Sequence, residues 1–325
     1  MLGSLDLARM LDRCRELQWE PSDLHWDQKP RAMSPEDERA IVQLFTDMAG
    51  IERLAGHLFV EQEKRAVDPT LKAIFRTFVK DEVRHAQVAQ MLADFYDVHH
   101  LTVYRQNEHL ARFTPAFVDV VRHLTDDVAN AYITVGELIL DIALLRSIND
   151  YVHDPMSAEA MRLINRDESR HIAIDYYMVE HYTTDAYEAK LAARPPAALG
   201  ERVRGAKAIG VMLYLGKPFF HDVFFAPMDR VDPSGRRLRE AFKRVQMLAA
   251  KPGVTRRPFG AFMIAMRDLY NTRLGRALLG RALTRLAGME PRFMENIPTS
   301  EEMARAGGMS FEELAEEALA VKEAG

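Results

Sequence analysis

The sequence predicts an all-α protein built around a four-helix bundle. Glycine and proline are scarce, with 17 and 15 copies in 325 residues, and the alternation of apolar and polar residues that marks strands is nearly absent. Several long segments instead repeat apolar residues at the spacing of an α-helix. Each of the longest segments also begins with a local signal for a helix start.

Four helix starts share one chemical pattern, a capping residue followed by proline. The side-chain oxygen of the capping residue accepts a hydrogen bond from a backbone N–H that has no partner within the helix, and proline at the first helical position gives up an N–H that would have none. The four pairs are Ser34-Pro35, Asp68-Pro69, Thr114-Pro115 and Asp154-Pro155. They predict helices over residues 35–66, 69–97, 115–149 and 155–183.

The lengths of the connections predict how these helices are arranged. The first and second helices are joined by a short connection, and so are the third and fourth, whereas a longer stretch separates the second from the third. Short connections produce antiparallel hairpins, so two hairpins joined by a crossover form a four-helix bundle over residues 34–184.

Further helices are expected on both sides of the bundle. Residues 1–33 predict an amphipathic helix and a loop, and residues 185–325 predict additional helices that pack on the bundle. The additional helices are expected at 198–216, 233–249, 258–287 and 310–322. The last of them opens with a capping box, in which Ser310 is followed three residues later by Glu313.

Composition limits the class of protein. The single cysteine, Cys14, excludes a disulfide framework and a cysteine-based zinc site, and it favours a reducing, cytoplasmic setting. The N-terminal stretch is too acidic for a signal peptide, and the most apolar later run is interrupted by charges, so no membrane span is expected.

Charge is concentrated in one part of the chain, although the net charge is only -5. Residues 200–286 contain 18 Lys and Arg but 6 Asp and Glu. This region is either a solvated basic face or a docking surface for an acidic partner, and no nucleic-acid-binding motif accompanies it.

A repeated pentapeptide marks the centre of the second and fourth helices. "DEVRH" occupies residues 81–85 and "DESRH" occupies residues 167–171. Each glutamate, Glu82 or Glu168, follows its Asp-Pro cap at the same distance, so the two strings lie at the same depth in the bundle. Within each string Glu and His are three residues apart, which places both side chains on one face of a helix.

These Glu and His residues occupy positions where the helical pattern calls for apolar core residues. A lone buried carboxylate costs several kcal/mol unless it is paired or bound to a cation. A di-metal site of this type also needs one Glu from each remaining helix, and the apolar faces of those helices offer Glu52 and Glu137. Glu61 and Glu63 lie off this face and are expected at the surface.

The predicted ligand set is four glutamates and two histidines, which suits iron or manganese better than structural zinc. The two glutamates of each hairpin are expected to lie level with each other. The reason is that the connecting turn falls near the midpoint between them in the chain. The alternative is a bundle with two solvated Glu-His faces. The predicted ligands are Glu52, Glu82, His85, Glu137, Glu168 and His171.

The strings "DEVRHAQ" and "DESRHIA" resemble the paired D-E-x-R-H strings of the ferritin-like di-iron carboxylate superfamily. They are especially similar to those of multicomponent monooxygenase hydroxylases and acyl-carrier-protein desaturases, and the resemblance covers about residues 35–183. It implies a ferritin-like bundle with a non-haem centre of two iron ions, or of manganese and iron, that activates dioxygen, and it assigns the six residues above as ligands.

The resemblance also implies an outer layer of charge. Asp81 and Asp167 match acids that orient the ligand histidines, and Arg84 and Arg170 would offset their charge. Ordinary helix-surface charge is the alternative for all four residues.

Two departures limit the assignment to one subfamily. Ala89 stands where the radical-bearing subunit of ribonucleotide reductase has a tyrosine. Ile164 stands where aryl-amine N-oxygenases, which are also similar, have a third histidine.

Two further acids lie one helical turn beyond predicted ligands. Asp141 follows Glu137, and Asp175 follows His171. They are candidate catalytic residues that move protons during oxygen activation, or they are polar contacts between helices.

The predicted function is a di-iron oxygenase that uses dioxygen to hydroxylate, N-oxygenate or desaturate a small organic or acyl substrate. Its electrons would come from an external donor, such as an acidic ferredoxin-like or carrier protein, because no flavin, nicotinamide or iron–sulfur motif is present. A ferroxidase or other iron-handling protein, and a non-catalytic bundle with structural metal, are the alternatives. A homodimer is left open.

Overall fold

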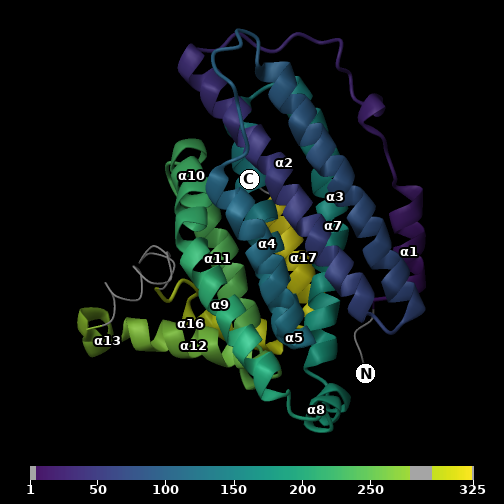
Figure 1. Ribbon diagram of the computed structural model, residues 1–325, viewed down its shortest axis with the longest axis vertical. Helices are drawn as coiled ribbons and strands as arrows, with labels where there is room; N and C mark the ends of the chain where they lie inside the picture. The colour runs from purple at the N-terminus through teal and green to yellow at the C-terminus, as the bar shows by residue number, and fades with distance from the viewer. Residues whose placement is uncertain (1–4, 279–294, 324–325) are drawn as a thin grey trace.

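The computed structural model describes residues 5–278 and 295–323, and all regular secondary structure in this part of the chain is helical (Figure 1). This confirms the predicted all-α class. Four long helical segments run side by side and enclose the core of the bundle. They are α2 (Pro35–Arg65), α3 (Pro69–Tyr96), the continuous stretch of α5 (Asp126–Ile139), η2 (Leu140–Leu145) and α6 (Arg146–Val152), and α7 (Pro155–Tyr182).

Three of the four predicted cap-proline starts are confirmed. The Ser34 side chain accepts a hydrogen bond from the backbone N–H of Asp37 at 3.1 Å. Asp68 accepts from two backbone N–H groups at the start of α3, at 2.8 and 2.9 Å. Asp154 accepts from Met156 at 2.9 Å and starts α7. Local cap chemistry therefore sets the depth of both pentapeptides.

The fourth predicted start, Thr114-Pro115, is wrong. Pro115 lies inside α4 (Glu108–His123), a helix of the crossover that is capped instead by Asn107. Leu110 and Phe113 precede the proline, and both are almost fully buried against the bundle. We attribute the continuation of the helix through Pro115 to this packing, which offsets the lost backbone hydrogen bond. The third bundle helix begins at Asp126, after the extended residue Thr125.

The third bundle helix widens in its middle. Residues Leu140–Leu145 form a π-helical turn, and Asp141 is buried within it. Such turns insert one extra residue and are frequent at functional sites. After this turn the helix is again α-helical and ends at Val152.

This same stretch, Asp126–Val152, is the one helix in the described part of the chain that is long and apolar enough to cross a membrane by length and composition. Its most apolar window is 67% buried inside the protein. Because it lies within the bundle and contains Glu137 and Asp141, we interpret it as a core helix.

Additional helices cover the bundle on several sides. The N-terminal α1 (Leu7–Glu16) contacts α3 and α7, and the C-terminal α17 (Phe311–Glu323) contacts α7 and η2. Helix α9 (Leu199–Phe219) packs on α4, and α11 (Arg236–Ala249) packs on α5 and η2. The remaining helical segments are η1 (Pro21–Asp23), α8 (Asp185–Ala192), η3 (Phe220–Phe225), α10 (Ala226–Val231), η4 (Val254–Arg256), α12 (Pro258–Asn271), α13 (Arg273–Leu278) and α16 (Ser300–Gly308).

The predicted C-terminal helices are largely found. The capping box is present, because the Ser310 hydroxyl accepts from the N–H of Glu313 at 3.0 Å and the Glu313 carboxylate accepts from the N–H of Ser310 at 2.6 Å. The predicted helix over 258–287 is divided into α12 and α13, and its residues from 279 onward lie outside the described residues.

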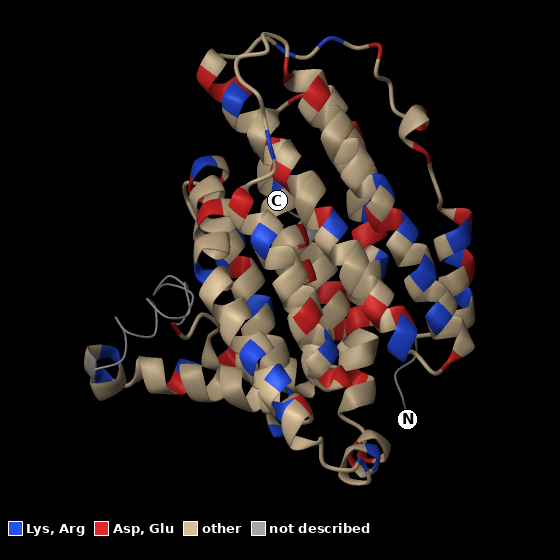
Figure 2. Ribbon diagram, in the orientation of Figure 1, with Lys and Arg blue, Asp and Glu red and all other residues tan. Residues whose placement is uncertain are grey.

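Many charges of the basic region are paired within the molecule. Figure 2 shows Lys and Arg on both α9 and α11. Some of those on α11 reach acids on other helices, as in the pair of Lys243 with Glu302 at 2.5 Å and the pair of Arg244 with Glu317. Arg230 of α10 likewise lies 3.1 Å from Glu36 at the start of α2. Part of the charge excess therefore holds the C-terminal helices in place.

The two Asp-Pro caps differ in burial, which predicts unequal effects on stability. The buried carboxylate of Asp154 also accepts a hydrogen bond from the Tyr96 hydroxyl at 3.0 Å, whereas Asp68 is exposed and only caps α3. We expect Asp154→Ala to lower the free energy of unfolding by about 3 kcal/mol, because it removes a cap and leaves a buried hydroxyl unpaired. The matched change Asp68→Ala should cost about 1 kcal/mol. Urea denaturation of both variants measures the difference, and equal losses would contradict the assigned role of the Tyr96 contact.

Candidate metal centre

Six acidic and imidazole side chains meet in the middle of the bundle. They form two groups of four, and within each group one potential ligand atom per residue lies within 4.8 Å of all the others. Glu82 and Glu168 belong to both groups. The first group is completed by Glu52 and His85, and the second by Glu137 and His171. The structure thus brings together all six residues that the sequence singled out.

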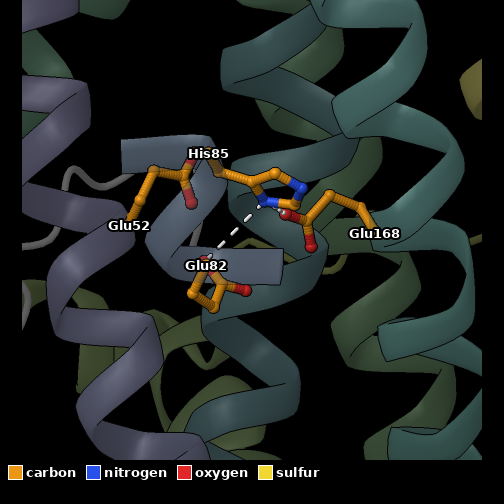
Figure 3. Close-up of side chains that lie close together, drawn as sticks. All are labelled: Glu52, Glu82, His85 and Glu168. Atoms are coloured by element: carbon orange, nitrogen blue, oxygen red, sulfur yellow. Dashed lines mark ion pairs between the residues drawn. The ribbon is translucent and has the colours of Figure 1, made fainter. Parts of the chain in front are cut away.

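Each group draws on three helices. In the first group, Glu52 comes from α2, Glu82 and His85 from α3, and Glu168 from α7, and their polar ends point toward one another (Figure 3). Gly56 of α2 lets the two helices of the first hairpin approach closely, because a Cβ atom there would lie 3.2 Å from the Cβ of Glu82.

Both imidazoles turn the same nitrogen inward. His85 Nδ1 lies 3.0 Å from a Glu168 oxygen and 3.9 Å from a Glu82 oxygen. His171 Nδ1 lies 2.9 Å from the other Glu168 oxygen and 3.2 Å from Glu82. The two shared carboxylates therefore lie between the two imidazoles.

Several inward atoms lack a well-aligned hydrogen bond. All six side chains are buried, and although the Glu82 oxygens and the Nδ1 atom of His85 lie close to other atoms of the cluster, their geometry does not give a hydrogen bond. Leaving a buried polar atom unpaired costs about 1–3 kcal/mol, and more for a charged group. The donor set of carboxylates and imidazoles is one that fits iron or manganese. The residues present therefore fit a bound metal, and they could hold one.

The electrostatics of the cluster also favour bound cations. Burial, and then the neighbouring carboxylates, raise the pKa of Glu52 and of Glu137 well above the ordinary value. Burial acts in the same direction on Glu168, but His171 and His85 outweigh it and hold the pKa of Glu168 well below its ordinary value. Two divalent cations would neutralise the four carboxylates with both imidazoles uncharged.

A second layer of residues crosses between the two hairpins. Burial disfavours a charged His85, but Asp167 and Glu168 outweigh burial and raise the pKa of this imidazole well above its ordinary value. Asp167 of α7 lies 3.2 Å from the outward Nε2 atom of His85 on α3, and Asp81 of α3 lies 3.5 Å from the Nε2 atom of His171 on α7. Each aspartate thus orients the histidine of the other pentapeptide, which is how outer carboxylates fix the tautomer and ring direction of metal ligands.

Two arginines balance these aspartates. Arg170 donates to Asp167 at 2.7 Å and approaches Asp81 at 3.4 Å. Arg84 pairs with Asp81 and approaches Asp167 at 3.3 Å. The Arg84 and Arg170 side chains are only 8% and 4% exposed and the aspartates are fully buried, so the alternative of ordinary surface charge is wrong for all four.

The N-terminal segment closes this network, a contribution that the sequence analysis missed. Gln18 donates to Asp81 at 3.1 Å and accepts from Arg84 at 3.0 Å. The Trp19 indole N–H donates to Asp167 at 2.7 Å, and its ring stacks on His85 with centroids 6.4 Å apart. No local motif marks these residues. A large aromatic residue beside a predicted amphipathic helix was the one available signal.

Aromatic side chains shield the second group from water. Phe78 and Phe59 pack against the His171 ring with centroids 4.1 and 5.0 Å apart, and Phe75 contacts both. All three phenylalanines are fully buried. This apolar surface lowers the local dielectric constant, which strengthens every charge interaction at the site.

The two candidate catalytic acids are both buried near the cluster. Asp141 lies in the π-helical turn, and Asp175 lies one turn beyond His171. Burial raises the pKa of Asp175 well above its ordinary value, although His171 and Thr134 act against it. Their proton-transfer role stays a prediction.

The expected surface position of Glu61 is wrong. Glu61 is 6% exposed and pairs with Lys64 at 2.8 Å and with Arg122 of α4 at 2.9 Å. It is covered because the crossover forms α4, which the sequence analysis did not foresee. Glu63 is half-buried and pairs with Arg76 at 2.7 Å.

No protein-family model matches this sequence, and no curated protein shows significant similarity to it. The fold and the site alone define its class, which is an all-helical protein whose buried Glu and His residues could hold metal.

The sharing of ligands predicts unequal losses of metal. We expect Glu168→Ala to lower metal content at both positions, because its carboxylate belongs to both groups, and Glu52→Ala or Glu137→Ala to lower it at one position only. Metal affinity at an affected position should fall by more than about a hundredfold. Loss of a residue that only hydrogen-bonds to a ligand already lowers affinity by up to about that factor. Elemental analysis of loaded and desalted protein measures this. Glu63→Ala is the control and should retain all metal, and equal losses for Glu52→Ala and Glu168→Ala would rule out shared carboxylates.

The two tryptophans provide a test of the N-terminal contribution. Trp19 stacks on His85, whereas Trp26 donates to the Pro21 carbonyl oxygen at 2.7 Å and contacts Phe95. Trp19→Phe should weaken metal binding about tenfold, because it removes a bond to the carboxylate that orients His85. The matched control Trp26→Phe should leave affinity unchanged.

Tryptophan fluorescence provides a second test with the same two variants. Because these are the only tryptophans in the chain, each variant retains a single indole. Titration with Co²⁺ should quench the fluorescence of Trp26→Phe, whose remaining indole is Trp19, far more strongly than that of Trp19→Phe. Similar quenching in both would show that the metal does not bind beside His85.

Proposed function

We propose that the protein is a non-haem di-iron oxygenase of ferritin-like type. The observation that carries the proposal is the pair of ligand groups that share Glu82 and Glu168. A single-metal structural site would need only one of these groups. The outer layer of paired Asp and Arg residues, which orients both imidazoles, adds support because a merely structural site has little need of it.

Two iron ions are the proposed occupants, with a manganese–iron pair as the variant. Glu52 and His85 would hold one ion and Glu137 and His171 the other, with Glu82 and Glu168 between them. When bound, the ions would supply the electrons that activate dioxygen. The protein orients the ligands through Asp81 and Asp167 and excludes water with its phenylalanines.

The proposed route for substrate is a cavity at the end of the bundle near α8. It has a volume of about 540 Å³ and is lined by Phe75, Ile133 and Asn130 at its inner side. Phe75 contacts Phe78, which packs against His171, so one aromatic layer separates the cavity from the second ligand group. A cavity of this size suits a small organic or acyl substrate.

Asp141 and Asp175 are proposed to hold and move the protons of the reaction. Both are buried one turn from a ligand, where water has little access. An external donor would supply further electrons, as expected from the absence of a second redox motif in the sequence. Hydroxylation, N-oxygenation and desaturation are all compatible with this site.

The test is oxygen consumption by protein loaded with ferrous iron under anaerobic conditions. We expect two irons per chain and rapid uptake of dioxygen with a change in the optical spectrum, and Glu168→Ala should lose both. Repeated turnover with a chemical reductant favours the oxygenase. Continued oxidation and accumulation of added iron, with a very large assembly by light scattering, favours the ferroxidase alternative. Fewer than two metals per chain would sink both.

A further inference from the structure

Helix α9 is apolar on two opposite sides, although only one side is covered. The covered side packs on α4 and contains Ala208, Met212, Gly216 and Phe219, all of which are buried. A helix that is apolar on all sides is normally buried on all sides. The uncovered side of α9 therefore needs an explanation.

The uncovered side carries large apolar residues near both ends of the helix, with the small residues Ala206 and Gly210 between them. Leu199, Val203, Leu213 and Tyr214 are 75%, 61%, 54% and 76% exposed. At 3.6 residues per turn these four positions fall within one face of the helix, opposite the buried one. Ordinary surface hydrophobic residues are scattered singly, whereas this group follows the length of a 21-residue helix.

Basic residues border this face. Arg202 and Lys207 lie on its two sides and Lys217 lies at its C-terminal end, all exposed. None of these three forms an ion pair with any residue that the structure describes, in contrast to the paired basic residues of α11. The one acid of the helix, Glu201, lies on the other side and accepts the N–H of Ala198 at the start of α9.

We infer that this face of α9 docks on the surface of an anionic lipid membrane. An apolar helix face with Lys and Arg at its borders inserts its apolar side chains at the level of the headgroups, while the basic side chains contact lipid phosphates. Tyr214, with an apolar ring and a polar hydroxyl, is a residue type enriched at that level. The inference does not depend on the chemistry of the metal centre.

Charge and shape favour a membrane over other occupants. A second copy of the chain that packed with the same face would bring the basic residues of both copies together, with no acid of that face to offset them. The residues of this face line none of the three main cavities of the described part of the molecule. A lipid surface, unlike an inserted side chain of a partner, requires no pocket.

Helices α12 and α13 also carry exposed apolar residues. Phe262 and Leu269 of α12 and Leu274 of α13 are 56%, 40% and 70% exposed, and Arg273 and Arg276 accompany them. These two helices project from the bundle (Figure 1). They carry a second combination of exposed apolar and basic residues.

The experiment is flotation of the full-length protein with phosphatidylcholine vesicles, with and without phosphatidylglycerol. The wild type should float with the anionic vesicles only, and high salt should weaken this binding. Removing two charges in Arg202→Ser/Lys207→Ser should reduce the partition coefficient about thirtyfold. Leu213→Glu should abolish flotation even at low salt.

The control is Val103→Glu, which alters an apolar residue that is 78% exposed in the crossover, away from α9. It should float like the wild type. Circular dichroism and metal content must be unchanged in all variants, so that loss of flotation is not loss of fold. A fluorescent label at Leu213→Cys, feasible because the native Cys14 is fully buried, should report an apolar environment on vesicle binding, and a label at Val103→Cys should not.

Two results would overturn the inference. The wild type could fail to float with anionic vesicles, or Leu213→Glu could float as well as the wild type. Dimerisation that Leu213→Glu abolishes, or salt-sensitive binding of an acidic carrier protein, either one without flotation, would assign the face to a protein partner instead.

Discussion

Four carboxylates and two imidazoles in one buried space are the constraint on which the rest of this structure depends. Without cations these groups must share protons, and burial already raises the pKa of Glu52, Glu82 and Glu137. Each of these six groups would carry a large free-energy cost if it were buried alone among the surrounding apolar residues. The bundle is therefore organised so that the groups meet at one level and satisfy one another, or a bound cation satisfies them.

The helix starts are part of this organisation. Asp68 and Asp154 fix where α3 and α7 begin, and each places a Glu and a His the same number of turns farther along. The buried Asp154 is also bonded to Tyr96 and to the backbone N–H of Arg31, which connects the start of α7 to α3 and to the N-terminal segment. Cap chemistry at the starts of these two helices thereby aligns side chains in the core.

Residue patterns predicted the cluster well because its members repeat at helical spacing. Glu52 and Glu137 were found from the apolar faces of their helices, and the structure brings them to the two pentapeptides. The start of the third helix was misplaced because Thr114-Pro115 has the form of a cap, while Leu110 and Phe113 pack well enough to keep α4 helical through the proline. The correct signal for the start of this helix was Thr125 followed by the two acids Asp126 and Asp127. Gln18 and Trp19 could not be predicted, because their partners are more than 60 residues away and their position depends on tertiary packing.

The crossed contacts between aspartates and histidines have a consequence for the symmetry of the protein. Asp167 reaches His85 at 3.2 Å and Asp81 approaches His171 at 3.5 Å, so the two hairpins meet much as the subunits of an isologous dimer do, with a similar contact made twice. The single chain is in this sense a tethered pair of half-molecules, and neither hairpin alone can orient its own imidazole. The N-terminal segment breaks the equivalence, since an amide side chain bonds to one aspartate and an indole to the other. The two halves of the centre are thus built alike but held in different surroundings, and two ions bound there would be chemically distinguishable.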